Sequence, residues 1–133
     1  MILSDAERSM LIEELARTPR ALLETHTHEG FARTASCGDE VTIRARVAGT
    51  EIQELGWNGH GCTVSMAATA ALARLAPIAV SEFRAHFARY VESVNGTAPL
   101  EGDLEAFAGI GRFPLRGQCA TLAWRALSEA LAD

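Results

Sequence analysis

Residues 37–62 carry the sequence CGDEVTIRARVAGTEIQELGWNGHGC. Apolar and polar residues alternate strictly from Val41 to Val47, which is the period of a half-buried β-strand. Ala48-Gly49-Thr50 supplies a turn, and Ile52 to Trp57 is predicted to form the returning strand. The stretch therefore predicts an antiparallel hairpin with a cysteine at each end. The residues from Phe31 to Ala35 are expected to pair with it as a third strand.

Helical patterns surround this hairpin on both sides. Ser4 and Glu7 have the spacing of a capping box, which predicts a helix from Asp5 to about Thr18. The further predicted helical segments are Ala21–Thr27, the alanine-rich Ser65–Leu75, a helix capped by Ser81 that runs to Val94, a short turn from Asp103 to Phe107, and a last helix from about Gln118 to Ala132. Together these elements predict an α+β fold, in which a small antiparallel sheet of about three strands packs against several helices.

Composition limits the classes of function. The chain of 133 residues is the size of one domain, so residues 1–133 are expected to form a single unit. A net charge of −5 and the absence of lysine argue against nucleic-acid binding. No apolar run reaches membrane-spanning length, and the first residues lack a signal-peptide pattern. With an odd number of cysteines, these features predict a cytoplasmic protein whose thiols stay reduced.

The three cysteines and one aspartate have contexts that suit a metal ion. Cys37-Gly38-Asp39 forms a turn from which both side chains can reach one ion. Cys62 directly precedes the alanine-rich helix, and Cys119 is predicted to begin the last helix, where the helix dipole favours a thiolate. Three thiolates and a carboxylate make a complete four-coordinate set for zinc. The alternative is that each cysteine is an inert core residue and Asp39 only a turn residue.

Other polar residues leave more than one interpretation open. Arg116 precedes Cys119 by one helical turn and can stabilise a thiolate or a persulfide, or form a surface ion pair. His60 stands between two glycines and is either a ligand, a proton carrier or a solvated residue. The roles of His26 and His28 stay equally open.

Three motifs in this order resemble a known family. They are Cys37-Gly38-Asp39, the run from Gly59 to Ala68 around Cys62, and the run from Phe113 to Trp124 around Cys119. The pattern resembles the iron–sulfur cluster assembly family that includes IscU, the NifU N-terminal domain and SufU. It is most similar to SufU, because the segment between the second and third cysteines is long. In addition, Gln118 occupies the position where scaffold-type IscU proteins carry histidine. The N-terminal region diverges from the family pattern.

The resemblance implies a SufE/NifU-like (IscU-like) fold and a zinc site formed by Cys37, Asp39, Cys62 and Cys119. It implies that Cys37 accepts persulfide sulfur from a cysteine desulfurase of the SufS type. Cys37 would be released from zinc when a histidine of the partner takes its place. Arg116 would assist at the same site, and the sulfur would pass to a downstream iron–sulfur scaffold.

Two alternatives follow from the same four side chains. The first is a scaffold that assembles a transient [2Fe–2S] cluster, so that iron takes the place of zinc. The second is a structural zinc module that binds a protein partner without handling sulfur. A hydrolytic zinc enzyme is disfavoured, because it needs an open coordination position that a fourth ligand at Asp39 would close. The sequence does not indicate an oligomeric state.

Overall fold

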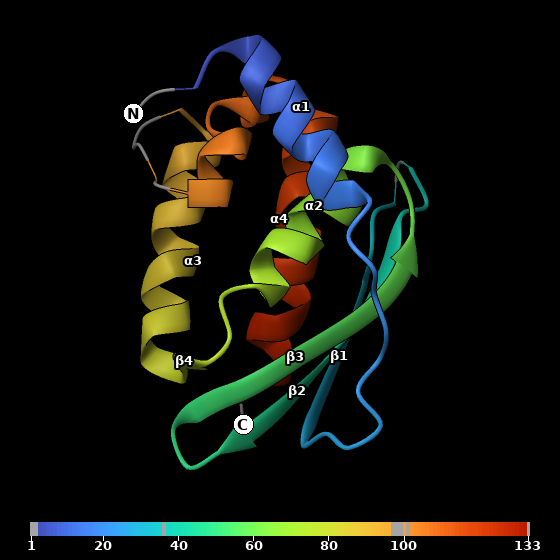
Figure 1. Ribbon diagram of the computed structural model, residues 1–133, viewed down its shortest axis with the longest axis vertical. Coiled ribbons are helices and arrows are strands. Elements are labelled where there is room, and N and C mark those ends of the chain that lie inside the picture. The colour runs from blue at the N-terminus through green and yellow to red at the C-terminus, as the bar shows by residue number, and fades with distance from the viewer. Residues whose placement is uncertain (1–2, 36, 97–99, 101, 133) are drawn as a thin grey trace.

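The structure, a computed structural model, describes residues 3–35, 37–96, 100 and 102–132. Helices lie on one side of an antiparallel sheet, which confirms the predicted α+β fold (Figure 1). The elements in chain order are α1 (Asp5–Ala16), β1 (His28–Arg33), β2 (Glu40–Ala48), β3 (Glu51–His60), α2 (Thr63–Ala73), β4 (Ile78–Ala79), α3 (Val80–Val94), the 3₁₀ helices η1 (Gly102–Phe107) and η2 (Ile110–Arg112), and α4 (Pro114–Ala130).

The sheet is built on the predicted hairpin. In the described part of the chain it has four strands in the order β1-β2-β3-β4, and each neighbouring pair is antiparallel. Strands β2 and β3 meet at a turn in which Gly49 has a φ of +60°, a conformation that glycine adopts without steric cost. The predicted third strand is β1, displaced a few residues toward the N-terminus. The two-residue strand β4 was not predicted, because two residues are too few to show an alternating pattern.

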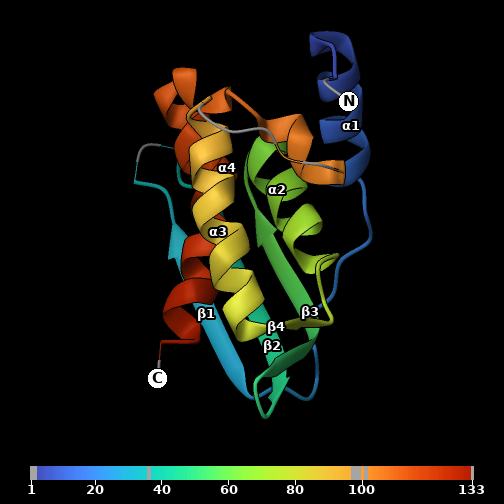
Figure 2. The ribbon, with the colours of Figure 1, turned by 90° about the vertical axis from the view of Figure 1, so that its left-hand side faces the viewer.

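Helices α2 and α4 cover the inner face of the sheet, while α1 lies on α2 and α3 lies beside α4 (Figure 2). Val41, Ile43 and Ala45 point into this interface and are fully buried. Helix α4 approaches β1 so closely that a Cβ at Gly30 would lie 2.3 Å from the Ala126 carbonyl oxygen. The close contact fixes α4, which carries the third cysteine, against the sheet.

An aromatic cluster fixes α4 from its other side. The rings of Tyr90 and Trp124 stack with their centroids 4.3 Å apart, and Phe83 stacks on Trp124 at 5.8 Å. The Tyr90 hydroxyl donates a hydrogen bond of 2.7 Å to the Ala120 carbonyl oxygen. Burying such large aromatic side chains contributes a major share of the stability of a small domain. Helix α4 therefore has little freedom to move relative to α3.

The prediction of a short helix over Ala21–Thr27 is wrong. The segment instead begins beside β3, where the Trp57 N–H donates a 3.1 Å hydrogen bond to the Ala21 carbonyl oxygen, and ends beside β2, where the Thr27 N–H donates a 2.9 Å hydrogen bond to the Ala45 carbonyl oxygen. Leu23 packs where Gly56 has no side chain, at 2.9 Å from the position of a Cβ. Backbone groups at both ends of the segment thus find partners in the sheet, and these contacts outweigh the weak helical preference of the segment.

Two helix starts also differ from prediction. Helix α3 begins at Val80 with Ala79 as its N-cap, so Ser81 lies inside the helix and does not cap it. Helix α4 begins at Pro114, four residues before the predicted start, because proline suits the first helical position. The capping box of Ser4 and Glu7 is confirmed. Asp103 lies within η1 and forms an ion pair with Arg74 at 3.0 Å. Among the described residues, no helix is long and apolar enough to cross a membrane.

Candidate metal centre

Asp39, Cys62 and Cys119 meet at one end of the sheet. Each offers one ligand atom, and these three atoms lie within 4.8 Å of one another. The residues come from the turn before β2, the N-cap of α2 and the second turn of α4. The fold thus brings together side chains that are far apart in the sequence, as expected for a site that joins the sheet to two helices.

Cys62 is the N-cap of α2, as the sequence predicted. Its sulfur accepts a hydrogen bond of 3.5 Å from the backbone N–H of Ser65. The N–H groups at the start of α2 place the positive end of the helix dipole beside this sulfur. Cys62 is also exposed, and the centre therefore faces solvent on this side.

Ser65 is a part of the centre that the sequence analysis missed. Its side chain is fully buried, and its hydroxyl donates a hydrogen bond of 2.6 Å to Asp39 Oδ2. The Cys62 sulfur lies 3.6 Å from the same hydroxyl. The sequence does carry a signal for Ser65, because it is the third residue after the N-cap Cys62. At this position a side chain lies on the same side of the helix start as the capping side chain. Ser65 therefore orients the carboxylate relative to both cysteines.

Asp39 is held as an ionised carboxylate. Its backbone is fixed by Thr34, whose hydroxyl accepts a hydrogen bond of 3.1 Å from the Asp39 N–H. Burial alone would raise the pKa of Asp39, but hydrogen bonds from Ser65, Cys62 and Cys119 outweigh it, so the pKa lies below its ordinary value. The carboxylate is consequently negative at neutral pH and ready to bind a cation.

Cys119 differs from the prediction. It lies in the second turn of α4 and not at the helix start, and only 3% of it is exposed. Burial raises the pKa of its thiol far above the ordinary value, which is opposite to the acidity expected from a helix N-terminus. The thiol donates a hydrogen bond of 3.2 Å to Asp39 Oδ2. Without a cation this sulfur therefore stays protonated.

Cys37 lies apart from the other three predicted ligands. All four are in the described part of the chain, and the cluster of ligand atoms contains only Asp39, Cys62 and Cys119. Cys37 is exposed in the turn that follows β1, and Gly38, with a φ of +71°, separates it from Asp39. Its part as the fourth ligand stays a prediction. Its exposure leaves the sulfur accessible to a partner.

The remaining candidates lie in the surroundings of the centre. The Arg116 guanidinium stacks over the Phe113 ring at 5.0 Å, so its role toward a sulfur stays a prediction. His60 is exposed and forms an ion pair of 3.3 Å with Glu40, which also pairs with Arg33. The hydrogen bond from Arg33 holds the pKa of Glu40 below its ordinary value.

His26 and His28 lie away from the three clustered ligands. His26 Nε2 is 3.6 Å from a Glu29 carboxylate oxygen, and the His28 ring is hydrogen-bonded to the Thr27 hydroxyl at 2.8 Å. Both histidines thus pair with close sequence neighbours around the start of β1.

The donor set fits zinc. A tetrahedral zinc ion has Zn–S bonds of about 2.3 Å and Zn–O bonds of about 2.0 Å, which places its ligand atoms roughly 3.5–3.8 Å apart. The three atoms observed here lie within 4.8 Å of one another, so only small side-chain adjustments are needed. Two sulfurs and one carboxylate oxygen are ligands that zinc and iron both accept, which leaves the choice of metal open.

Gly61 gives a first prediction about this centre. A Cβ at Gly61 would lie 2.6 Å from Asp39 Cγ, closer than two such atoms approach in proteins. Gly61→Ala is therefore expected to displace the Asp39 carboxylate and weaken zinc affinity by about tenfold or more. The measurement is competition for zinc with a chromogenic chelator.

The matched control is Gly49→Ala at the opposite end of the hairpin. Unlike Gly61, this glycine has open space around the position of a Cβ, but its φ is positive, so the substitution costs stability without touching the centre. We expect it to lower the melting temperature and to keep full zinc affinity. Equal zinc affinities in Gly61→Ala and the wild type would show that Asp39 does not bind the metal.

The fold and the donor cluster together define a small α+β protein with a cysteine–aspartate centre between a hairpin and two helices. Residues 14–133 match the NifU-like N terminal domain family, and the chain belongs to this family. This agrees with the resemblance that the three motifs indicated. Both IscU and SufU proteins are among the relatives of the chain.

The chain is 33% identical over 104 residues to the iron–sulfur cluster assembly scaffold protein IscU of Streptococcus pyogenes serotype M1. The matched region covers 72% of this chain and 64% of that protein. It is 27% identical over 107 residues to the zinc-dependent sulfurtransferase SufU of Bacillus subtilis (strain 168), covering 73% and 69%. The chain thus spans about two-thirds of the length of these relatives.

The crystal structure of a SufU-type scaffold protein from Fervidobacterium islandicum AW-1 has the same fold. Its TM-score is 0.79 at 24% identity, with 98% of this chain and 97% of that chain covered. The similarity therefore extends over nearly the whole chain, although at this identity it bears on the fold alone.

Proposed function

We propose that this protein acts in iron–sulfur cluster assembly as a zinc-binding sulfur acceptor, with Cys37 as the residue that receives the sulfur. The observation that carries the proposal is the arrangement of the four predicted ligands. Asp39, Cys62 and Cys119 cluster, while Cys37 stands exposed two residues from Asp39. An exposed cysteine beside a candidate metal centre that itself faces solvent at Cys62 suits transfer between proteins. The Bacillus relative, named a zinc-dependent sulfurtransferase, supports the same function.

The chain's own residues divide the work of holding the metal. When bound, zinc keeps coordinated thiols deprotonated and protects them from oxidation. Asp39 contributes a carboxylate that is already ionised, and Ser65 keeps it oriented. Cys119 is anchored in the core by α4, and Cys62 by the start of α2. These three suit a permanent role, whereas Cys37 is exposed and lies outside their cluster.

Sulfur transfer to Cys37 balances without an added oxidant or reductant. The Cys37 thiolate attacks the outer sulfur of a persulfide on the donor, a cysteine desulfurase of the SufS type. A new S–S bond forms at Cys37 while the S–S bond of the donor breaks, and the donor cysteine leaves as a thiolate with the electron pair. The negative charge passes from one cysteine to the other. A downstream iron–sulfur scaffold would receive the sulfur by the same exchange.

A scaffold role is the second candidate function. The streptococcal relative is named a cluster assembly scaffold, and a [2Fe–2S] cluster would be cargo bound by the same four side chains. Gln118 before Cys119 favours the sulfur acceptor, because the resemblance places histidine there in scaffold-type IscU proteins. Anaerobic reconstitution with iron and sulfide separates the two functions. A stable visible cluster formed in the presence of zinc would favour the scaffold.

Zinc binding is expected to depend on pH, with affinity rising as pH rises. Binding requires each thiol to lose its proton, and burial holds the pKa of Cys119 above the ordinary value for cysteine. Between about pH 6 and pH 8 the apparent affinity should rise about tenfold per pH unit for each such thiol. Asp39 does not add to the dependence of zinc affinity on pH in this range, since its pKa is lowered and its carboxylate is already ionised.

Chelator competition at several pH values measures this slope. Cys119→Ser serves as the comparison, because it removes one titrating thiol and should reduce the slope by one proton per zinc. An affinity independent of pH would contradict coordination by buried thiols. Zinc-stimulated formation of alanine from cysteine by a SufS-type desulfurase, measured with and without this protein, tests the sulfur-acceptor function itself.

A further inference from the structure

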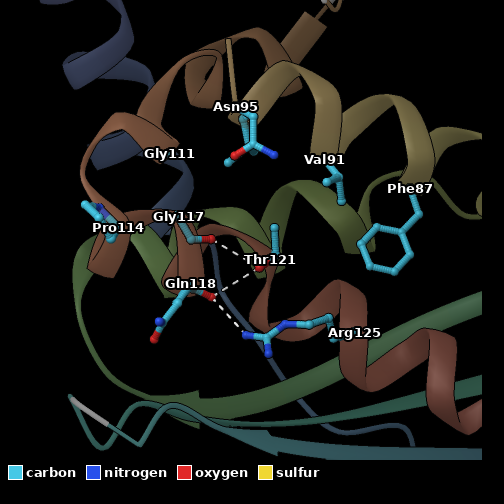
Figure 3. A pocket seen from close by; sticks show the side chains of 10 residues that line it. Phe87, Val91, Asn95, Gly111, Pro114, Gly117, Gln118, Thr121 and Arg125 are labelled. Carbon is cyan, nitrogen blue, oxygen red and sulfur yellow. Dashed lines mark hydrogen bonds between the residues drawn. The ribbon is translucent and has the colours of Figure 1, made fainter. Parts of the chain in front are cut away.

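A groove lies between α3 and the first turns of α4, on the side of α4 away from α2 (Figure 3). Its volume is about 440 Å³. Phe87, Val91 and Val94 form an apolar wall on α3. The opposite side is polar and consists of Gln118, Thr121 and Arg125 from α4, with Asn95 at the end of α3.

Backbones approach each other closely at the glycine residues that line the groove. A Cβ at Gly111 would lie 2.8 Å from the Val94 carbonyl oxygen, and a Cβ at Gly117 would lie 3.1 Å from the Gly111 Cα. The two glycines allow η2 to pack directly on α3 and α4. The groove is thus a built feature of the fold, present without a ligand.

Arg125 gives the groove an unmatched positive charge. Arg125 is exposed, and its guanidinium donates a hydrogen bond of 3.2 Å to the Gln118 carbonyl oxygen. Within the described part of the chain no carboxylate forms an ion pair with it; the arginines that do form such pairs are Arg8, Arg33, Arg44, Arg46 and Arg74, and none of these lines the groove. Among the residues that the structure describes, Arg125 is also the only charged one that lines the groove.

An apolar wall beside an unmatched guanidinium defines the chemistry of the occupant. We propose that the groove docks a short segment of a partner protein that presents a large aliphatic side chain next to a carboxylate. The side chain would cover Val91, which is 37% exposed, and the carboxylate would pair with Arg125. A free carboxylate or an acidic side chain meets this requirement equally. Apolar residues exposed at a concave surface are typical of such contacts.

The position of the groove links docking to the candidate metal centre. Gln118 lines the groove, and the next residue, Cys119, is a member of the metal-ligand cluster. A segment seated in the groove would therefore lie against the turn of α4 that carries Cys119. The inference goes beyond the proposed function, because it requires neither bound zinc nor sulfur transfer.

The test uses two small probes and the whole zinc-loaded chain. N-acetyl-leucine has the aliphatic side chain and the carboxylate, whereas N-acetyl-leucinamide has the same side chain without the charge. An amide NMR titration is expected to show shifts around residues 87–95 and 114–125 with N-acetyl-leucine. Its affinity should exceed that of the amide by about fivefold, which corresponds to roughly 1 kcal/mol.

Three exposed substitutions complete the experiment. Arg125→Gln is expected to remove the preference for the carboxylate, and Val91→Glu should abolish binding of both probes by placing a carboxylate in the groove. Arg89→Gln is the control: Arg89 lies on α3, like Val91, but outside the groove, so this substitution should leave the affinity for both probes unchanged. Shifts that map elsewhere, equal affinities for the two probes, or no binding would each overturn the proposal. Zinc content and sulfur transfer are measured separately, so failure here leaves the proposed function standing.

Discussion

Replacing Cys37 with alanine is expected to reduce acceptance of persulfide sulfur by more than about a hundredfold, because no other residue can replace a lost nucleophile. The fold should remain intact. Cys37 is exposed in a turn and contributes nothing to the buried core, so the free energy of unfolding without metal should change by less than about 0.5 kcal/mol. The measurement is transfer of labelled sulfur from a SufS-type desulfurase, with circular dichroism as the check on folding.

Ala35→Ser in the same exposed turn is the control for disturbance of the turn itself, and it should accept sulfur at the wild-type rate. A Cys37→Ala protein that still acquires labelled sulfur at full rate would remove Cys37 from its assigned role. Another cysteine of the centre would then have to be the acceptor.

Replacing Cys119 with serine should have the largest effect on metal binding. The substitution removes a buried sulfur ligand and is expected to weaken zinc affinity by about a hundredfold or more. The serine hydroxyl can still donate a hydrogen bond to Asp39, as the thiol does at 3.2 Å, so the fold without metal should be nearly unchanged. The stabilisation that zinc gives should therefore fall by about 3 kcal/mol, measured as the difference in unfolding free energy with and without zinc.

Removing zinc with a chelator separates the effect of Cys119→Ser on metal binding from its effect on the fold. In excess chelator, wild type and Cys119→Ser are expected to unfold at similar denaturant concentrations, and they should separate only when zinc is added. Ser128→Ala on the same helix lies away from the centre, with its hydroxyl bonded to Arg84 at 3.4 Å, and should respond to zinc like the wild type. Equal stabilisation of wild type and Cys119→Ser by zinc would show that Cys119 is not a ligand.

Much of the fold was accessible from local patterns. The hairpin of β2 and β3 was predicted because alternation over Val41–Val47 allows only one face to be buried. The course of Ala21–Thr27 was not predicted, since it depends on backbone partners in β2 and β3, which are formed by residues further along the chain. The start of α4 at Pro114, four residues before the predicted one, was missed although its signal is local, because proline is well suited to the first helical position.

In the candidate centre too, some features follow from local sequence patterns and others depend on tertiary packing. The turn with Cys37 and Asp39 and the capping position of Cys62 follow from neighbouring residues, and the sequence indicated both. The burial of Cys119 and the hydrogen bond from Ser65 to Asp39 depend on how α2 and α4 pack, so local patterns could not reveal them. The separation of Cys37 from the three clustered ligands is likewise a tertiary feature.

Mapping of persulfide on each cysteine by mass spectrometry tests the central claim most directly. The zinc-loaded protein would be incubated with a SufS-type desulfurase and cysteine, then trapped with an alkylating reagent and digested. The account predicts an added sulfur on Cys37 and none on Cys62 or Cys119, together with faster alanine formation by the desulfurase. Persulfide on Cys62 or Cys119, or no persulfide while zinc stays bound, would contradict the assignment of this protein as a sulfur acceptor through Cys37.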